Sequence, residues 1–275
     1  DKLLNPKNYL KGEAFDAVMN YRLYRATRHF FNQSPSKIPV SEFVDSLRSF
    51  NSDLRKQNIY GMMNLTASHD VPRFATDIFN KNKYKVGTNP YKGNDYKIHK
   101  PDAETYEIMK MILVQQFTYI GSPHIWAGDE MGMWGGDDPN CRKPLIWKDL
   151  DFEPETHHQV DYFSRPKDEV KFNDELFGFY KKLIKIRKEN SVLAFGDIEY
   201  LIVDDEREIL AYSRFDGKNE VIVVFNNSKN EVNVNVLKKQ HKKDYQNILN
   251  GIKISAQDGK GIILTMPAKS FVILK

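Results

Sequence analysis

The chain has 275 residues, of which 40% are hydrophobic and 12% aromatic, so it can bury a sizeable core and is not expected to be disordered. Its 41 basic and 37 acidic residues are scattered along the whole length and give a formal charge of +4, so no nucleic-acid partner is expected. No apolar run reaches the roughly 18 residues of a membrane span, and the first residues lack the pattern of a signal peptide, so we expect a soluble chain. Cys141 is the only cysteine, which excludes an internal disulfide and a multi-cysteine metal site.

The first half of the chain alternates apolar runs with helical patterns. A short apolar run at 14–21 predicts a strand that leads into a helix-like segment. Residues 41–54 carry apolar side chains at three- and four-residue steps and predict a helix, with Ser41 as its N-cap. A second apolar run, 59–70, predicts a buried strand, and the polar stretch 80–100 predicts a surface loop.

A further helix and strand continue this order. Pro101 and Asp102 are start signals for a helix whose apolar stripe runs to Phe117, and residues 123–130 predict a third strand. A last helix, 174–190, ends in basic residues, as the C-terminus of a helix favours. Strands that alternate with helices are typical of parallel βα units with the helices outside.

The sequence changes character beyond residue 190. Short alternating segments separated by polar turns follow, among them Asp216-Gly217, which is typical of a hairpin turn. We therefore expect two parts, with βα units in residues 1–190 and a small antiparallel β-sandwich in residues 191–275.

A histidine and an aspartate, His69 and Asp70, stand at the end of the second predicted strand. In a barrel of βα units this end is the face on which substrates bind, so the position favours a function. Adjacent residues on a strand point to opposite faces, so both reach that face only if one lies in the loop beyond, and Pro72 favours such a loop. An alternative stays open, in which Asp70 caps a helix beginning near Pro72 and His69 bonds a buried backbone group.

The stretch 121–147 is rich in acidic and aromatic residues. A retaining glycosidase needs two carboxyl groups about 5 to 5.5 Å apart. Asp129 and Glu130, as neighbours on one strand, diverge and favour a structural role that includes a salt bridge to a basic residue. Trp134 beside two glycines is a candidate platform for stacking a sugar, with a core position as the equal alternative. Asp137 and the aspartate after it lack a regular metal-ligand spacing and predict a loop turn instead of a metal site.

Three segments together resemble the α-amylase clan of glycoside hydrolases, with neopullulanases, cyclomaltodextrinases and gut-bacterial starch-utilisation amylases as the nearest branch. They are FDAVMNY at 15–21, NLTASHDVPRF at 64–74 and the stretch 121–147. These resemble barrel strand six, the signature region at strand seven, and strand eight with its long loop. The resemblance covers essentially the whole chain and implies an α/β plus all-β fold: the C-terminal portion of a (β/α)8 barrel followed by an antiparallel β-sandwich.

The resemblance also implies roles for individual residues. The family's histidine and aspartate at strand seven bind sugar hydroxyls at the cleavage subsite and stabilise an oxocarbenium-like transition state, and they correspond to His69 and Asp70. The family's arginine three residues after that aspartate, which acts structurally or near the substrate, corresponds to Arg73. The position of the loop after strand eight adds Trp134 and Asp137 to the substrate groove.

The chain departs from the family because it lacks the motifs of the catalytic pair. The family's nucleophilic aspartate follows strand four and its acid/base glutamate follows strand five, and Glu13, which precedes strand six, does not match that acid. Residue 1 is Asp, and three strands cannot close a barrel that needs eight, so we expect the C-terminal fragment of a larger enzyme. One supporting carboxylate cannot perform double displacement, so we expect negligible hydrolysis by the chain alone.

The expected partners are an α-glucan oligosaccharide derived from starch and the missing N-terminal part of the barrel. No cofactor or metal site is expected in this chain; calcium is common in the clan, but its usual ligands lie largely in the missing part. The resemblance favours a periplasmic or secreted bacterial enzyme. A non-catalytic carbohydrate-binding or scaffold protein, in which the sandwich and Trp134 hold glucan, stays the alternative, and a plain interaction protein ranks last.

Overall fold

The structure, a computed structural model, describes residues 9–10, 14–52, 54–83, 96–155, 167–237, 244–255 and 261–275. Glu13 lies outside the described residues, as do His157, His158 and most of the loop expected at 80–100. The first part contains short strands and longer helices: α1 (Tyr21–Thr27), the π-helical turn η3 (Arg28–Asn32), α2 (Val40–Ser52), α3 (Lys56–Gly61), β1 (Met63–Leu65), α4 (Phe74–Phe79), α5 (Ala103–Thr118), β2 (Ser122–His124), the 3-10 turns η6 (Asp129–Met131) and η7 (Asn140–Arg142), α6 (Asp174–Glu189) and α7 (Ser191–Phe195).

A short parallel ladder is the centre of this first part. β1 and β2 pair in parallel over three residues each, and Met19 forms an isolated parallel bridge to Met63 in β1. The three segments expected as strands therefore lie side by side in chain order, but they are shorter than expected. The strand at 14–21 is reduced to the bridge at Met19, because helix α1 begins directly after it. The run 59–70 contributes three residues, because α3 occupies its beginning.

Two helix caps explain where the helices of the first part begin. Asp102 caps α5 as expected, since its Oδ1 accepts the Thr105 backbone N–H at 2.9 Å. The prediction that Ser41 caps α2 is wrong, because α2 begins at Val40. Instead, the Ser41 backbone N–H and hydroxyl donate to the two carboxylate oxygens of Asp205 at 2.7 and 2.6 Å. A carboxylate from the second part of the chain thus satisfies the first turn of α2.

The second part is antiparallel, as expected. Its strands are β3 (Asp197–Asp204), β4 (Ile209–Phe215), β5 (Glu220–Asn226), β6 (Val232–Val236), β7 (Asp244–Gln246), β8 (Lys253–Ser255), β9 (Ile262–Met266) and β10 (Ser270–Leu274). A four-stranded sheet in the order β10-β5-β4-β3 faces the pair β6-β9, with the hairpin β7-β8 beside them. The hairpin turn predicted at Asp216-Gly217 is confirmed, since Asp216 Oδ1 accepts the N–H groups of Lys218 and Asn219, each at 2.7 Å, between β4 and β5.

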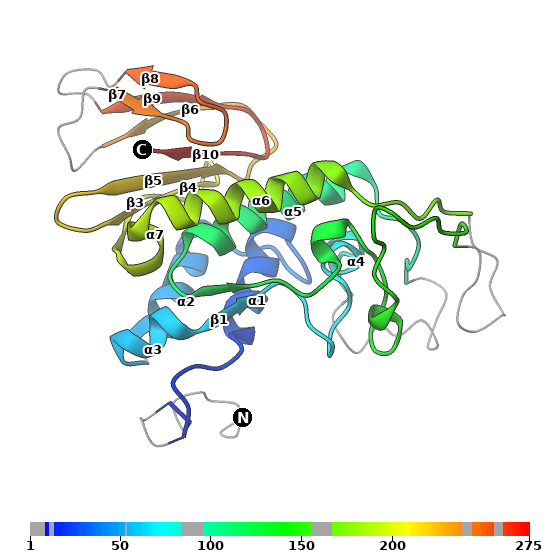
Figure 1. Ribbon diagram of the computed structural model, residues 1–275. Coiled ribbons are helices and arrows are strands. Elements are labelled where there is room, and N and C mark those ends of the chain that lie inside the picture. The colour runs from blue at the N-terminus through cyan, green and yellow to red at the C-terminus, as the bar shows by residue number, and fades with distance from the viewer. Residues whose placement is uncertain are drawn as a thin grey trace.

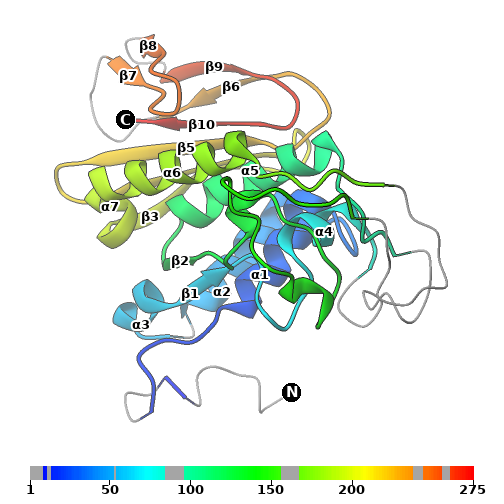
Figure 2. The same cartoon turned by 45° about the vertical axis from the view of Figure 1, so that its right-hand side comes forward.

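One hydrophobic core joins the two parts. Figures 1 and 2 show α5 and α6 as a layer between the four-stranded sheet and the elements around β1. Phe31, just after α1, packs edge-on against Phe225 of β5 with ring centroids 5.1 Å apart. Ile273 of β10 belongs to the same buried cluster as Leu113 of α5 and Leu183 of α6. The four-stranded sheet is therefore covered on both faces, by helices on one and by β6 and β9 on the other.

Candidate active site

The loop that follows β1 is held in a tight turn at Ser68. This serine is buried, and its Oγ accepts the Asp70 backbone N–H at 3.1 Å. The same Oγ lies within hydrogen-bond distance, 3.0 Å, of the Tyr21 hydroxyl at the start of α1. Since Tyr21 follows the bridge at Met19, this hydrogen bond joins the ends of two neighbouring parallel segments.

His69 and Asp70 are exposed side by side at this turn. Their side chains are 47% and 51% exposed, and His69 Nε2 lies 3.3 Å from Asp70 Oδ1. The turn therefore brings together two groups that an extended strand would separate. Because both groups reach solvent, the imidazole N–H can donate a hydrogen bond to a sugar hydroxyl, and the carboxylate can accept one. The capping alternative for Asp70 is wrong, because α4 has Arg73 at its N-cap position and no side-chain cap.

Arg73 lies in the interior beside this turn. Its side chain is 2% exposed, and its Nε donates to the Cys141 carbonyl at 2.7 Å. Its Nη1 donates to the Ala127 carbonyl at 2.5 Å and to Asp129 Oδ1 at 3.3 Å. One guanidinium thus connects the loop after β1, the loop after β2 and the turn η7. Of the two roles that the resemblance implied for Arg73, this burial favours the structural one.

Asp129 is the buried acidic partner of Arg73. It is 1% exposed, and burial raises its pKa from the ordinary 3.8 to about 7, although the Arg73 charge opposes that shift. The neighbouring Glu130 turns away, and its Oε2 accepts the Gly128 backbone N–H at 2.9 Å. The predicted salt bridge to a basic residue is confirmed for Asp129, whereas the prediction that the two acids are neighbours on one strand is wrong, because β2 ends at His124 and both lie in the turn η6.

Trp126 lies between Arg73 and His69. Its ring centroid is 6.0 Å from that of the His69 imidazole, and the Arg73 guanidinium lies 5.4 Å from the indole centroid. Trp126 was not predicted as a site residue. The prediction of a strand over 123–130 placed Trp126 inside that strand, whereas β2 ends at His124, so Trp126 follows the strand end as His69 does after β1.

The other two predicted groove residues lie further along the loop after β2. Trp134 is 4% exposed, with Lys143 Nζ 5.8 Å from its ring centroid, so the core alternative describes its place in this structure. Asp137 is partly exposed, and its Oδ1 accepts the N–H of the next residue at 3.0 Å, as in a loop turn. An exposed aromatic side chain is found instead at Trp147, which is 51% exposed and was given no role.

Comparison with known proteins assigns both parts of the chain. A profile described as "Alpha amylase, catalytic domain" matches residues 4–196, and one described as "Maltogenic Amylase, C-terminal domain" matches residues 198–273. This chain belongs to the α-amylase family. Its predicted fold, the C-terminal portion of a (β/α)8 barrel followed by an antiparallel β-sandwich, is thereby confirmed.

Curated relatives of this α-amylase family chain are longer than it is. A cyclomaltodextrinase of Geobacillus thermopakistaniensis is 31% identical over 265 residues, which cover 96% of this chain and 37% of the relative. Neopullulanase 2 of Thermoactinomyces vulgaris is 30% identical over 219 residues, which cover 80% of this chain and 30% of that protein. The chain thus spans 37% or less of the length of these two relatives.

Solved structures agree with this assignment to the α-amylase family. A cyclomaltodextrinase structure superposes with a TM-score of 0.71 at 25% identity and covers 98% of this chain, which corresponds to 38% of that structure. An α-amylase of Geobacillus thermoleovorans, solved with acarbose, gives a TM-score of 0.69 at 17% identity and shows the likeness of fold alone.

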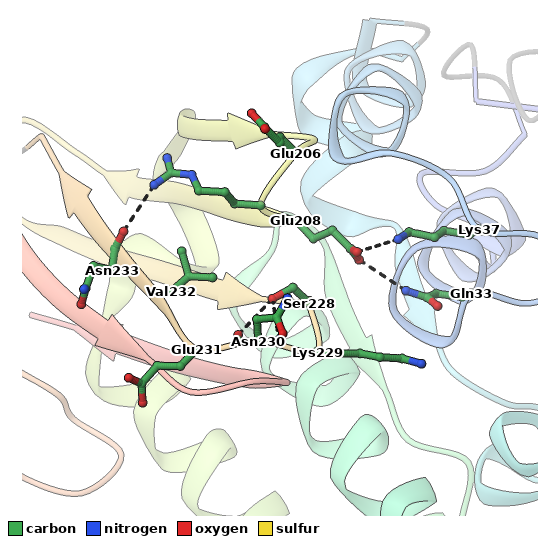
Figure 3. Close-up of a pocket in the computed structure, with 11 residues that line it drawn as sticks. Gln33, Lys37, Glu206, Glu208, Ser228, Lys229, Asn230, Glu231, Val232 and Asn233 are labelled. Atoms are coloured by element: carbon green, nitrogen blue, oxygen red, sulfur yellow. Dashed lines mark hydrogen bonds and ion pairs between the residues drawn. The ribbon is translucent and has the colours of Figure 1, made fainter.

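The surface of this α-amylase family chain also has a groove that none of the candidate site residues lines. It is a groove of about 760 Å³ between the sandwich and the segment after α1 (Figure 3). Glu208 there accepts hydrogen bonds from Lys37 Nζ at 2.5 Å and Gln33 Nε2 at 3.4 Å. The described residues that line it are charged or polar apart from Val232, and none is aromatic. This groove therefore lacks a platform for stacking a sugar ring.

The described ranges contain neither a candidate metal centre nor a candidate membrane span. No three His, Cys, Asp or Glu side chains gather there closely enough to hold a metal ion. No helix within those ranges has both the length and the apolar character needed to cross a bilayer.

Proposed function

We propose that this chain forms part of the active site of a retaining hydrolase that acts on α-1,4 or α-1,6 linkages of starch-derived oligosaccharides. The observation that carries the proposal is the paired exposure of His69 and Asp70 after β1, in a chain of the α-amylase family. Relatives named cyclomaltodextrinase, maltogenic α-amylase and neopullulanase support an α-glucan as the substrate class.

His69 and Asp70 act on the sugar unit whose glycosidic bond is cleaved. The imidazole donates a hydrogen bond to a sugar hydroxyl, and the carboxylate accepts one. Positive charge develops on the sugar ring as the oxocarbenium-like transition state forms, and the fixed negative charge of Asp70 stabilises it. Because that stabilisation is stronger in the transition state than in the ground state, it raises kcat.

The nucleophile and the general acid are supplied by the remainder of the barrel. Support for this division comes from the relatives, of which the chain spans 37% and 30%, and from the absence of both family motifs in the sequence. The partners are therefore an α-glucan oligosaccharide and that remaining part of the barrel. The chain by itself cannot form the covalent glycosyl intermediate and hydrolyses negligibly.

The proposal is tested by measuring the reducing sugar released from maltoheptaose. The assay compares the chain alone with the intact protein that carries the rest of the barrel. We expect release by the intact protein only, and Asp70→Asn in that protein to lower kcat about 100-fold or more, as for loss of a transition-state group. Asp138→Asn, which changes an exposed carboxyl in the loop after β2, is the matched control. Unchanged turnover in Asp70→Asn removes this residue from the mechanism, and release by the chain alone contradicts the division of roles.

The alternative of a non-catalytic carbohydrate-binding or scaffold protein has less support. From β3 onwards, the exposed large apolar side chains of the described residues are aliphatic, namely Val203, Leu237, Ile252 and Ile263, and the exposed aromatic Phe195 lies before β3 at the end of α7. Aliphatic side chains do not provide the flat rings on which sugars stack. Two results together would favour this alternative: the chain binds maltoheptaose equally well with and without Asp70→Asn, and the intact protein is inactive. The periplasmic or secreted location stays a prediction, which fractionation of the source cells would test.

A further inference from the structure

A continuous series of contacts leads from the buried Asp129 to the exposed His69. Asp129 Oδ1 accepts from Arg73 Nη1 at 3.3 Å, and the Arg73 guanidinium lies 5.4 Å from the Trp126 ring centroid. The Trp126 centroid in turn lies 6.0 Å from that of the His69 imidazole. Asp129, Arg73 and Trp126 come from two different loops, so the series depends on the tertiary fold.

A second path connects Arg73 to the backbone of His69. Arg73 Nε donates to the Cys141 carbonyl at 2.7 Å, and the Cys141 thiol donates to the His69 carbonyl at 3.5 Å. The Arg73 guanidinium is therefore linked both to the ring that lies beside the imidazole and to the main chain that carries it. Both paths pass through Arg73 before they reach His69.

We propose that Arg73, held by Asp129, is a positioning residue for the proposed active site. It keeps Trp126 beside the His69 ring and Cys141 beside the His69 carbonyl, so that His69 and Asp70 hold one orientation before a sugar arrives. The inference rests on the proposed function and goes beyond it by assigning the support of the site.

The chemistry of the guanidinium suits this role. Arginine presents several donors in a fixed plane and also lies well against an aromatic face, whereas lysine has one compact charge. Arg73 uses both properties, since its donors reach three acceptors while its plane lies near Trp126. Groups that are oriented in advance bind a transition state better, because they lose less freedom when it forms.

The test observes His69 directly in the 275-residue chain without sugar. The chemical shift of the His69 Cε1–H proton in nuclear magnetic resonance reports the ring current of Trp126. The resonance is assigned by its absence from the spectrum of His69→Gln. Trp126→Phe gives the chemical shift expected without the indole. We expect Arg73→Met and Asp129→Asn to move this resonance towards its position in Trp126→Phe. Arg73→Lys, which keeps the charge, should move it least.

Arg28→Met is the matched control. Arg28 forms an equally buried ion pair with Asp77, with side chains 3% and 2% exposed, elsewhere in the same part of the chain. Removing either arginine leaves a buried carboxylate without its partner, so both variants should lower the melting temperature. Only the Arg73 variants should move the His69 resonance, which a purely structural role would not predict.

The proposal is overturned if the His69 resonance stays at its wild-type position in folded Arg73→Met. Should Arg73→Met not fold, the same unchanged position in Arg73→Lys and Asp129→Asn overturns it. Adding maltoheptaose to the wild-type chain is a separate measurement. If the sugar leaves the His69 resonance unmoved although the variants moved it, the positioning role stands and the assignment of His69 to sugar binding fails.

Discussion

At the scale of single residues, Gly128 shows how closely the loop after β2 follows the Arg73 guanidinium. Its φ is +101°, and a Cβ atom there would lie 2.3 Å from Met133 Sδ and 2.9 Å from Arg73 Nη1. Gly128→Ala should therefore lower the free energy of unfolding by about 2–3 kcal/mol, measured by urea titration. Gly217→Ala is the control, because nothing lies within 4 Å of a Cβ there. An equal, small effect of both substitutions would contradict the tight packing at Gly128.

Asp129 should give the chain a recognisable dependence on pH. Its pKa is about 7 in the folded chain and near 3.8 when unfolded, so between these values the folded chain binds more protons. Stability due to this group is therefore highest below about pH 4 and falls as the pH rises to about 7. Unfolding measured from pH 4 to 8 should show a smaller such fall in Asp129→Asn than in the wild type. Parallel curves for the two proteins would show that Asp129 does not titrate in this range.

At the scale of secondary-structure elements, α2 depends on a cap from another part of the chain. Asp205 accepts from the Ser41 N–H and hydroxyl, as a cap residue next to the helix would. Asp205→Ala should lower the free energy of unfolding by about 1 kcal/mol, whereas Asp205→Asn should retain much of the effect because an amide oxygen also accepts. Thermal unfolding of the wild type and of the two variants measures this. A melting temperature of Asp205→Ala equal to that of the wild type would exclude the cap.

The helices could be predicted from the sequence better than the strands or the site. Asp102 lies next to the turn that it caps, so local chemistry identified α5 correctly. Ser41 was misassigned as the cap because α2 begins one residue earlier, and the carboxylate of Asp205, which satisfies its first turn, is remote in sequence. The burial of Trp134 likewise depends on how a long loop folds back, which periodicity does not encode. His69 was located through its position after a strand, while its neighbour Trp126 came from another loop and was missed.

At the scale of the whole molecule, the two parts share their interior. Arg214 of β4 is fully buried, and it donates to the carbonyls of Thr118 at the end of α5 and of Leu193 in α7, at 2.6 and 2.9 Å. Donors at a helix C-terminus satisfy carbonyls that the helix itself leaves free. Because of the shared core and this buried arginine, we expect the two parts to unfold as one cooperative unit.

Cooperativity can be tested because all three tryptophans lie before residue 197. Val224 belongs to the inner core of the sandwich, and its cluster contains no helix residue. Val224→Ala should lower the free energy of unfolding by about 2 kcal/mol. It should shift the midpoint of unfolding followed by tryptophan fluorescence as much as the midpoint followed by far-ultraviolet circular dichroism. A fluorescence midpoint that does not move would show that the first part unfolds independently.

The position of β10 also affects how the protein is made. This strand pairs with β5 and contributes Ile273 to the core shared with α5 and α6. Translation proceeds towards the C-terminus, so α5 and α6 are synthesised before residues 270–274. The apolar faces of α5 and α6 therefore stay uncovered until the sheet is synthesised, and apolar surface that is exposed during synthesis is prone to aggregation.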